Sequence, residues 1–360
     1  MKKALLWIIG IIILISLLIT GGYFILNKSQ KTPKEEQKEI VEEKKEPEIT
    51  NLMISAVGDC TIGNDSKVGN GWNNFNSYLK NGDYGYYFRG VYDVLNKDDI
   101  TIANLEGTFT EETDKAVKTF NFKNTKDYIN VLTEGSVEIV NLANNHTYDY
   151  KDKGYKDTIA ALDEYDLPYF GYENYTIKEI NNIKIGFAGL NYYDERNYEN
   201  FEKHITKAID YLKEQGADLI IFTFHWGIEA TYKQTEKQEE VGRFAIDNGA
   251  DLVIGHHPHR IQGIENYKGK YIVYSLSNFV FGGHRNPSDK DSFIYQQTFT
   301  FTDKKLTNTE VNLVPVRISG EESYNNYQPV IATGEQKTNI INKINANSIN
   351  FRWTDESHNY

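Results

Sequence analysis

The sequence of 360 residues contains one cysteine, Cys60. A single cysteine excludes an intrachain disulfide, a zinc ribbon, a CxxC redox pair and a cysteine-ligated iron–sulfur site. Because side chains alternate along a strand, we expect Cys60 to point away from its neighbour Asp59 and to be a small buried core residue. Stability must therefore come from packing or from metal ions.

Positive charge is also scarce, with 39 Lys and Arg against 51 Asp and Glu, a formal net charge of −12. Such a chain has no general basic field to hold a phosphate backbone, so we expect no nucleic-acid partner. The hydrophobic fraction of 39 % excludes a wholly disordered chain. Any anionic ligand needs local positive charge, which bound metal ions would provide.

Long hydrophobic runs are limited to residues 4–26, which carry no charge. At ~1.5 Å per residue these residues span roughly 35 Å, which predicts one membrane-spanning helix. Lys2 and Lys3 precede the run, so the positive-inside rule predicts a cytoplasmic N-terminus with the remainder of the chain outside the cell. The alternative is a cleaved signal peptide, but the run is longer than a usual signal core and no AxA-like site follows it. We therefore assign residues 1–27 to an uncleaved anchor.

Residues 28–50 contain six Lys and seven Glu but only three aliphatic residues. This composition buries too little apolar surface to fold, so it predicts a solvated, flexible stalk. We assign residues 51–360 to one domain of about 300 residues. Its tail after residue 337 shows only a helical pattern around 338–345 and no readable chemistry.

Short β-rich runs alternate with helical patterns along this domain, which predicts an α/β fold with strands buried on both faces. Gly216 and Gly249 follow two of the expected helices, where glycine supplies the left-handed cap. The expected strands are 52–58, 99–106, 137–143, 184–190, 218–226, 251–255 and 271–279, and the expected helices are 154–165, 201–215 and 235–248.

Polar side chains gather at the ends of these strands. Each alone has an ordinary explanation as a turn former, a loop carboxylate or a hydrogen-bonded core histidine. Together at successive strand ends they favour a site, because such loops bring distant residues together. Imidazole, carboxylate and amide ligands suit zinc, manganese or iron. The residues are Asp59, Glu106, Asn145, His146, His225, His256, His257 and His259.

Six segments in this order resemble the capsule-synthesis CapA (PgsA) family, which is tied to poly-γ-glutamate. They are GDCTIG (58–63), NLEGTF (104–109), NLANNHTYDYKDKG (141–154), FHWGIE (224–229), GADLVIGHHPHRIQGIE (249–265) and YSLSNFVFGG (274–283). The resemblance spans residues 51–283 and the N-terminal anchor. It implies the fold of the calcineurin-like metallophosphoesterases, a four-layer sandwich of two mixed β-sheets flanked by helices.

The resemblance also implies roles for individual residues around one or two divalent ions. Asp59 and His259 match ligands of the first ion, and Glu106 matches the carboxylate that bridges both. The second ion takes Asn145, His225 and His257. His146 matches the catalytic histidine that assists the leaving group.

Three departures from the phosphoesterase pattern affect the expected chemistry. Thr61 stands where the first ion usually has an imidazole ligand, so we expect that ion to bind weakly. The bridging aspartate is replaced by the longer Glu106. Thr147 stands where an acidic residue usually orients the catalytic histidine, which leaves Asp149 as the candidate substitute.

Two main functional hypotheses follow. The first is a membrane-anchored, extracytoplasmic component of poly-γ-glutamate-type capsule or exopolymer biosynthesis or export. Its partners would be the anionic polymer and other membrane subunits of a capsule synthesis complex, and its metal site would bind carboxylates. The second is an extracytoplasmic metal-dependent hydrolase of a phosphoester or amide in the cell envelope, with His146 donating a proton. A third reading is a structural protein whose inherited site is empty.

Overall fold

The computed structural model describes residues 2–28, 46–65, 67, 73–192 and 198–354. The chain divides into two compact units, Met1–Glu46 and Pro47–Tyr360. Most of the predicted stalk, residues 29–45, lies outside the described residues. The last two residues assigned to the stalk, Ile49 and Thr50, instead begin the first strand of the second unit.

In the described part of the first unit, helix α1 (Lys2–Lys28) covers the predicted hydrophobic run. Among the described residues, no helix reaches the length and hydropathy that a membrane crossing requires. The membrane-spanning role of residues 4–26 therefore stays a prediction.

An eight-stranded mixed sheet, the first sheet, forms one half of the second unit. Its strands run in the order β17-β16-β15-β1-β3-β6-β7, with β14 pairing with β1 as well. Strand β1 is parallel to β3 and β14 and antiparallel to β15. The bounds are β1 (Ile49–Thr61), β3 (Ile100–Leu105), β6 (Ile139–Asn141), β7 (Tyr169–Phe170), β14 (Asn278–Phe281), β15 (Asp291–Thr302), β16 (Lys305–Arg317) and β17 (Val330–Ile331).

A six-stranded mixed sheet, the second sheet, has the order β12-β13-β11-β10-β9-β8. Its central strands β9, β10, β11 and β13 are parallel. The bounds are β8 (Thr176–Ile180), β9 (Ile183–Asn191), β10 (Leu219–His225), β11 (Leu252–His256), β12 (Ile264–Tyr267) and β13 (Lys270–Val273). A small third sheet joins β2 (Asn64–Asp65), β5 (Phe122–Asn124) and β4 (Thr108–Phe109).

The two large sheets pack face to face, with helices on both outer faces. One cluster of buried side chains lies between the sheets and includes Ile54, Ile102 and Ile221. A second cluster packs α2 (Tyr92–Leu95), α3 (Asn130–Thr133) and α4 (Lys151–Glu164) on the first sheet. A third packs α5 (Tyr198–Glu214) and α6 (Glu236–Asn248) on the second sheet. The arrangement is a four-layer mixed α/β fold.

The helix ends follow from local sequence. Thr235 caps α6 through a capping box with Gln238, and Gly249 ends it at a φ of 122°. Gly216, after α5, has a φ of 81°. The tail helix α7 (Gly334–Ala346) begins four residues before the predicted one. Short 3₁₀ helices lie at Phe75–Tyr78, Tyr84–Tyr87 and Lys126–Ile129.

The predicted strand 271–279 is wrong as a single element. Residues 270–273 form β13 in the second sheet, whereas residues 278–281 form β14 in the first sheet. The chain crosses between the sheets in residues 274–277. This crossing passes close to Gly58, where an added Cβ would lie 2.1 Å from the carbonyl oxygen of Ser277.

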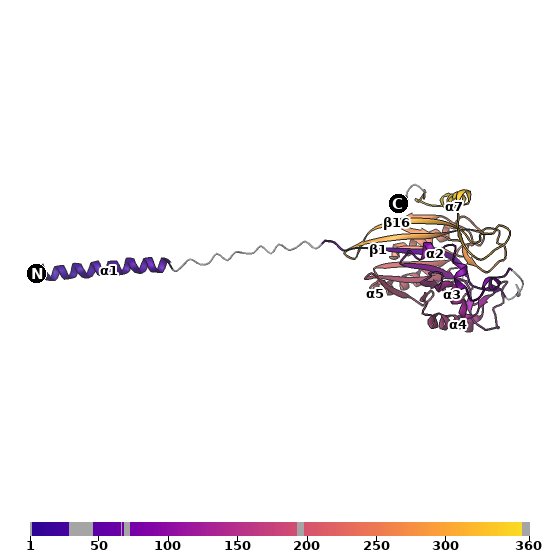
Figure 1. The fold of residues 1–360 in the computed structure, drawn as a ribbon, viewed down its shortest axis with the longest axis horizontal. Coiled ribbons are helices and arrows are strands. Elements are labelled where there is room, and N and C mark those ends of the chain that lie inside the picture. Colours follow the sequence, from indigo (N-terminus) through magenta and orange to yellow (C-terminus); the bar gives the residue numbers. More distant parts are fainter. Residues whose placement is uncertain (1, 29–45, 66, 68–72, 193–197, 355–360) are drawn as a thin grey trace. The chain divides into compact units, whose positions relative to one another are not determined.

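The sequence reading also missed the long hairpin of β15 and β16. Asp303 and Lys304 join these strands with φ values of 50° and 64°, which is the backbone of a tight hairpin turn. The hairpin lies along β1, so late and early parts of the sequence share one sheet (Figure 1).

Candidate metal centre

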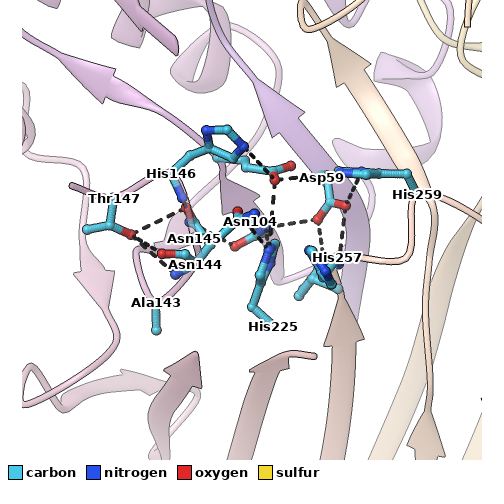
Figure 2. Close-up of polar contacts among 12 residues, drawn as sticks. Asp59, Asn104, Ala143, Asn144, Asn145, His146, Thr147, His225, His257 and His259 are labelled. Carbon is cyan, nitrogen blue, oxygen red and sulfur yellow. Dashed lines mark hydrogen bonds and ion pairs between the residues drawn. The ribbon is translucent and has the colours of Figure 1, made fainter. Parts of the chain in front are cut away.

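The predicted site residues converge at the carboxyl ends of strands from both sheets. Asp59 lies near the end of β1, and Glu106 directly follows β3. His225 and His256 are the last residues of β10 and β11. Figure 2 shows Asp59, His225 and His257 gathered at one place although they come from three separate strand ends. The structure thus brings together residues almost 200 positions apart.

Asp59 is completely buried and contacts several site residues. The Nδ2 of Asn104 donates to its Oδ1 at 2.8 Å, and His259 Nδ1 lies 3.0 Å from its Oδ2. His256 Nδ1 lies 3.4 Å from Oδ1. Burial alone would raise the pKa of Asp59, but the hydrogen bonds and charges of His256 and His259 hold that pKa well below its usual value. Asp59 is therefore an anion.

Glu106 is fully buried, and neither of its carboxylate oxygens has a hydrogen-bond partner among the described residues. Its Oε1 lies 3.8 Å from the Nε2 atoms of three histidines, His146, His225 and His259. These distances are too long for hydrogen bonds. Two atoms that share one transition-metal ion, each about 2.1 Å from it, lie roughly 3–4 Å apart. The surroundings of Glu106 therefore fit a bound cation.

Two groups of ligand atoms match the two predicted ions. In the first, Asp59, Glu106 and His259 each offer one atom, and these atoms lie within 4.8 Å of one another. In the second, His225 Nε2 lies 3.1 Å from Asn145 Oδ1, and the rings of His225 and His257 are 4.7 Å apart. The chemistry of both groups suits a divalent transition metal.

The pKa values of the site residues indicate which of them carry a proton in the metal-free protein. Burial, followed by the charge of Asp59, raises the pKa of Glu106 to about 8. For His259, burial lowers the pKa, but Glu106 and Asp59 together raise it to about 9. Burial and the neighbouring His259 lower the pKa of His257 to about 3. Burial and His257 also hold the pKa of His225 well below its usual value. His225 and His257 are thus neutral imidazoles, the form that binds metals.

The loop that carries two of the ligands has a strained backbone. His257 and His259 have φ values of 98° and 51°, in the region that residues other than glycine rarely adopt. Such conformations persist only where the surroundings hold them, and they cluster at functional sites. Arg260 helps to hold this loop, because its Nη1 donates to the carbonyl oxygen of His259 at 2.7 Å.

His146 lies beside Glu106, and Asp149 orients its ring. The His146 Nδ1 and Asp149 Oδ2 atoms are 2.7 Å apart, so Nε2 is left facing Glu106. Burial lowers the pKa of His146, although Asp149 opposes this shift. The residue that orients His146 is thus Asp149. Thr147 instead donates to the carbonyl oxygen of Leu142.

Lys118 is a site neighbour that the sequence analysis missed. Its Nζ donates to Asp149 Oδ1 at 2.7 Å and to the carbonyl oxygen of Asn145 at 2.8 Å. It therefore ties together the backbone of a candidate ligand and the partner of His146. No pattern marks Lys118 in the sequence, because it lies in a loop 27 residues before Asn145. Asn104 was also missed, although a polar residue in a buried strand was a readable signal.

Cys60 is a buried core residue, as the sequence predicts, and His284 lies near the candidate ligands. Cys60 is buried in the hydrophobic cluster on the helical face of the first sheet. Burial raises the pKa of its thiol to about 12, so it is not a thiolate ligand. His284 lines a pocket of about 340 Å³ together with His259. It therefore sits on the rim of the site.

Known proteins resemble this chain over the same region. Residues 53–283 match the profile of the family described as bacterial capsule synthesis protein PGA_cap. The chain is 33 % identical over 262 residues to a capsule biosynthesis protein CapA of Bacillus anthracis, covering 66 % of this chain and 61 % of that protein. It is 28 % identical over 218 residues to a PGA biosynthesis protein CapA of Bacillus subtilis, covering 54 % and 56 %.

The chain thus spans about three fifths of the length of these curated relatives. Among solved structures, a novel phosphatase from Mycoplasma pneumoniae is similar with a TM-score of 0.43 at 15 % identity, covering 74 % of this chain and 95 % of that chain. The match of the family profile includes every candidate ligand from Asp59 to His259. The chain belongs to the bacterial capsule synthesis protein family PGA_cap.

Proposed function

We propose that this protein is a membrane-anchored, extracytoplasmic component of poly-γ-glutamate-type capsule or exopolymer biosynthesis or export, and that its metal centre binds the polymer. The observation that carries the proposal is the family match over residues 53–283, because this segment contains the whole candidate metal centre. The names of the two Bacillus relatives point to the same process.

The site gives this role a physical basis. The sequence has a net charge of −12, so the bulk field repels an anionic polymer. A bound divalent cation would supply the local positive charge that carboxylates need. Asp59, Glu106 and His259 would hold one ion, and Asn145, His225 and His257 the other. Lys118 adds a cationic side chain at the edge of the site, where it is 29 % exposed.

The proposed location rests on the N-terminal sequence. Residues 4–26 are uncharged and form part of helix α1, and Lys2 and Lys3 precede them. This pattern supports an anchor with a cytoplasmic N-terminus and the second unit outside the membrane. An extracytoplasmic domain would meet the polymer, and other membrane subunits of the assembly, where the polymer leaves the cell.

Exopolymer yield in a strain that carries His225→Ala tests the proposed function. His225 is fully buried in the site, so His225→Ala removes a candidate ligand from its interior. We expect the yield to fall to near that of a deletion strain. The matched control is His204→Ala, because His204 is an exposed histidine on α5 whose side chain is 47 % exposed. Normal yield with His225→Ala, at equal protein level, contradicts the proposal.

A second candidate function, a metal-dependent hydrolase of metallophosphoesterase type, is favoured by the contacts of His146. Asp149 fixes its Nδ1 at 2.7 Å, and Lys118 and the backbone N–H of Phe122 hold the Asp149 carboxylate. His146 Nε2 is thereby aimed toward the metal ligands, where a leaving group would lie. In the doubly protonated form of His146, Nδ1–H would donate to Asp149 and the proton on Nε2 would pass to the leaving oxygen or nitrogen, which is general acid catalysis.

The variant His146→Ala separates the two candidates. His146 is not among the candidate ligands, so the metal content should stay normal. A hydrolase role predicts that turnover, and any polymer yield that depends on it, falls by on the order of 100-fold. Polymer binding alone predicts nearly normal yield. Normal yield with the metal retained rules out the hydrolase.

A further inference from the structure

The ligand set of the first ion is incomplete. Asp59, Glu106 and His259 supply one carboxylate or imidazole atom each, whereas Thr61 stands where a second imidazole is usual in the phosphoesterase pattern. Three protein ligands fill only part of the coordination sphere of a divalent ion and leave room for a further donor. We expect a fourth metal ligand to be a buried polar atom close to Asp59 that has no hydrogen-bond partner in the described residues.

Asn278 provides such an atom. It is 2 % exposed, and its Oδ1 is buried and has no hydrogen-bond partner in the described part of the chain. A buried amide oxygen left without a partner is costly, so it calls for an explanation such as a bound ion. Asn278 is the first residue of β14, directly after the crossing between the two sheets.

The strand register places Asn278 on the side of the sheet that carries the metal ligands. Asp59 on β1 is directly opposite Asn278 on β14 and opposite Asn104 on β3. Opposed residues of neighbouring strands point to the same face and lie about 5 Å apart. Asn104 on one flank already reaches Asp59 at 2.8 Å. Asn278 occupies the matching place on the other flank.

Asn278 also lines the same pocket as His259. Both residues line the pocket of about 340 Å³ at the rim of the site, together with the exposed carboxylate Glu229. Asn278 therefore shares strand register with one ligand of the first ion and a pocket with another. The same pocket opens toward solvent, so it offers a path by which an ion enters.

We propose that Asn278 Oδ1 is the fourth protein ligand of the first ion and substitutes for the imidazole that Thr61 lacks. This inference rests on the metal centre of the proposed function. The resulting set has three oxygens and one nitrogen, which favours a hard ion such as Mn²⁺ over zinc at this position. Within the described residues, the Thr61 hydroxyl is also buried without a partner, but an amide carbonyl is the better ligand of the two. His256 Nδ1 also has no hydrogen-bond partner there and lies 3.4 Å from Asp59 Oδ1, but His256 does not line the pocket that Asn278 shares with His259.

Two substitutions at this position test the assignment in opposite directions. In Asn278→Leu the ligand oxygen is replaced by an apolar group of similar size. In Asn278→Asp a charged oxygen takes its place. Titration of the full-length, metal-free protein with Mn²⁺, followed by calorimetry and by electron paramagnetic resonance, counts the bound ions and measures both affinities.

We expect the wild-type protein to bind one Mn²⁺ tightly and a second more weakly. Asn278→Leu should weaken the weaker step by at least about tenfold, since even residues outside the ligand set change metal affinity by 10–100-fold. Asn278→Asp should tighten that step, because ligand charge increases affinity. The tighter step, held by Asn145, His225 and His257, is the internal control and should not change in either variant.

The outcomes separate this inference from the proposed function. Two unchanged Mn²⁺ affinities in both variants, with native circular dichroism, overturn the role of Asn278 and leave the metal centre intact. Failure of the wild-type protein to bind Mn²⁺ overturns both. If Asn278→Leu does not fold, Asn278→Asp still decides, because a fourth ligand predicts tighter binding and a merely structural amide does not.

Discussion

At the scale of single residues, the site contains acidic groups and histidines whose pKa values are shifted in opposite directions. Asp59 is held anionic, whereas burial raises the pKa of Glu106 to about 8. His257 is neutral, with its pKa lowered to about 3, while that of His259 is raised to about 9. Pairs of groups whose environments push their pKa values apart mark functional sites. These are the groups that we propose to bind a divalent cation, and three of them, Asp59, Glu106 and His259, offer ligand atoms within 4.8 Å of one another.

Replacing His257 by Ala should remove most of the tightly bound metal. A ligand that binds only the folded state stabilises it by about 2.7 kcal/mol at 100 times its Kd, which corresponds to a Tm difference of about 5 °C. We therefore expect added metal to raise the Tm of the wild-type protein and not that of the variant. The exposed His204→Ala serves as the control. Equal metal content and equal Tm in His257→Ala would reject the centre.

Metal affinity should depend on pH in a direction set by Glu106 and His259. In the metal-free protein both pKa values are raised, to about 8 and about 9, so both groups hold protons at pH 7. Both must lose them to bind a metal, so apparent affinity should rise between pH 6 and about 9. His225 and His257 release no proton because they are already neutral. Calorimetry in buffers of different ionisation enthalpy measures the released protons, and pH-independent binding contradicts this account.

The residues that the sequence revealed are those with a positional signal. Asp59, Glu106 and His225 could be predicted as site residues because they are polar residues at the ends of strands. The hydrophobic pattern of the sequence locates these strand ends. Lys118 carried no such signal, since its role arises only when its loop folds over Asn145. Asn278 was hidden inside an apparent single strand. Proximity of the site residues was thus predictable, but their supporting contacts were not.

At the scale of elements, the central buried strands were readable because they are short apolar runs. Strands β3 and β10 are buried along their whole length. Residues 271–279 were wrongly predicted as one strand, because two strands that belong to different sheets follow each other with only four residues between them. The β15–β16 hairpin was missed although its residues alternate, because β16 is half exposed and lacks a continuous apolar run.

The crossing between the sheets makes Gly58 critical. Its added Cβ would lie 2.1 Å from the Ser277 carbonyl oxygen, so β14 must move away from β1 in Gly58→Ala. Overpacking of this kind costs about 1–3 kcal/mol, and the shift would also displace Asn278 from Asp59. We expect a lower urea midpoint and weaker metal binding. Gly320→Ala is the control, since its added Cβ meets nothing closer than 3.7 Å. Equal midpoints for the two variants contradict the close approach.

At the scale of the whole molecule, residues beyond the family match support the site. Lys343 on α7 contacts Asp289 at 3.1 Å, and the Arg260 guanidinium lies 3.9 Å from the same carboxylate. Arg260 in turn holds the His259 backbone. The C-terminal segment therefore helps to hold the loop that carries His257 and His259, although it lies outside residues 53–283. The sequence of this segment had suggested no role in the site.

The proposed topology makes a prediction about intact cells. With one uncleaved anchor near residues 4–26, added protease should digest the second unit in wall-stripped cells without permeabilisation. A cytoplasmic marker protein in the same sample is the control. Digestion only after permeabilisation, or a mature N-terminus beyond residue 26, contradicts the anchor.

The most direct test of the central claim is the metal content of the purified full-length protein. The protein is prepared without chelators and analysed by mass spectrometry for manganese, iron and zinc per chain. The account predicts about one tightly held divalent transition metal per wild-type chain, retained through dialysis and lost in His225→Ala. A wild-type chain that holds none of these metals, and takes none up on titration, would contradict it.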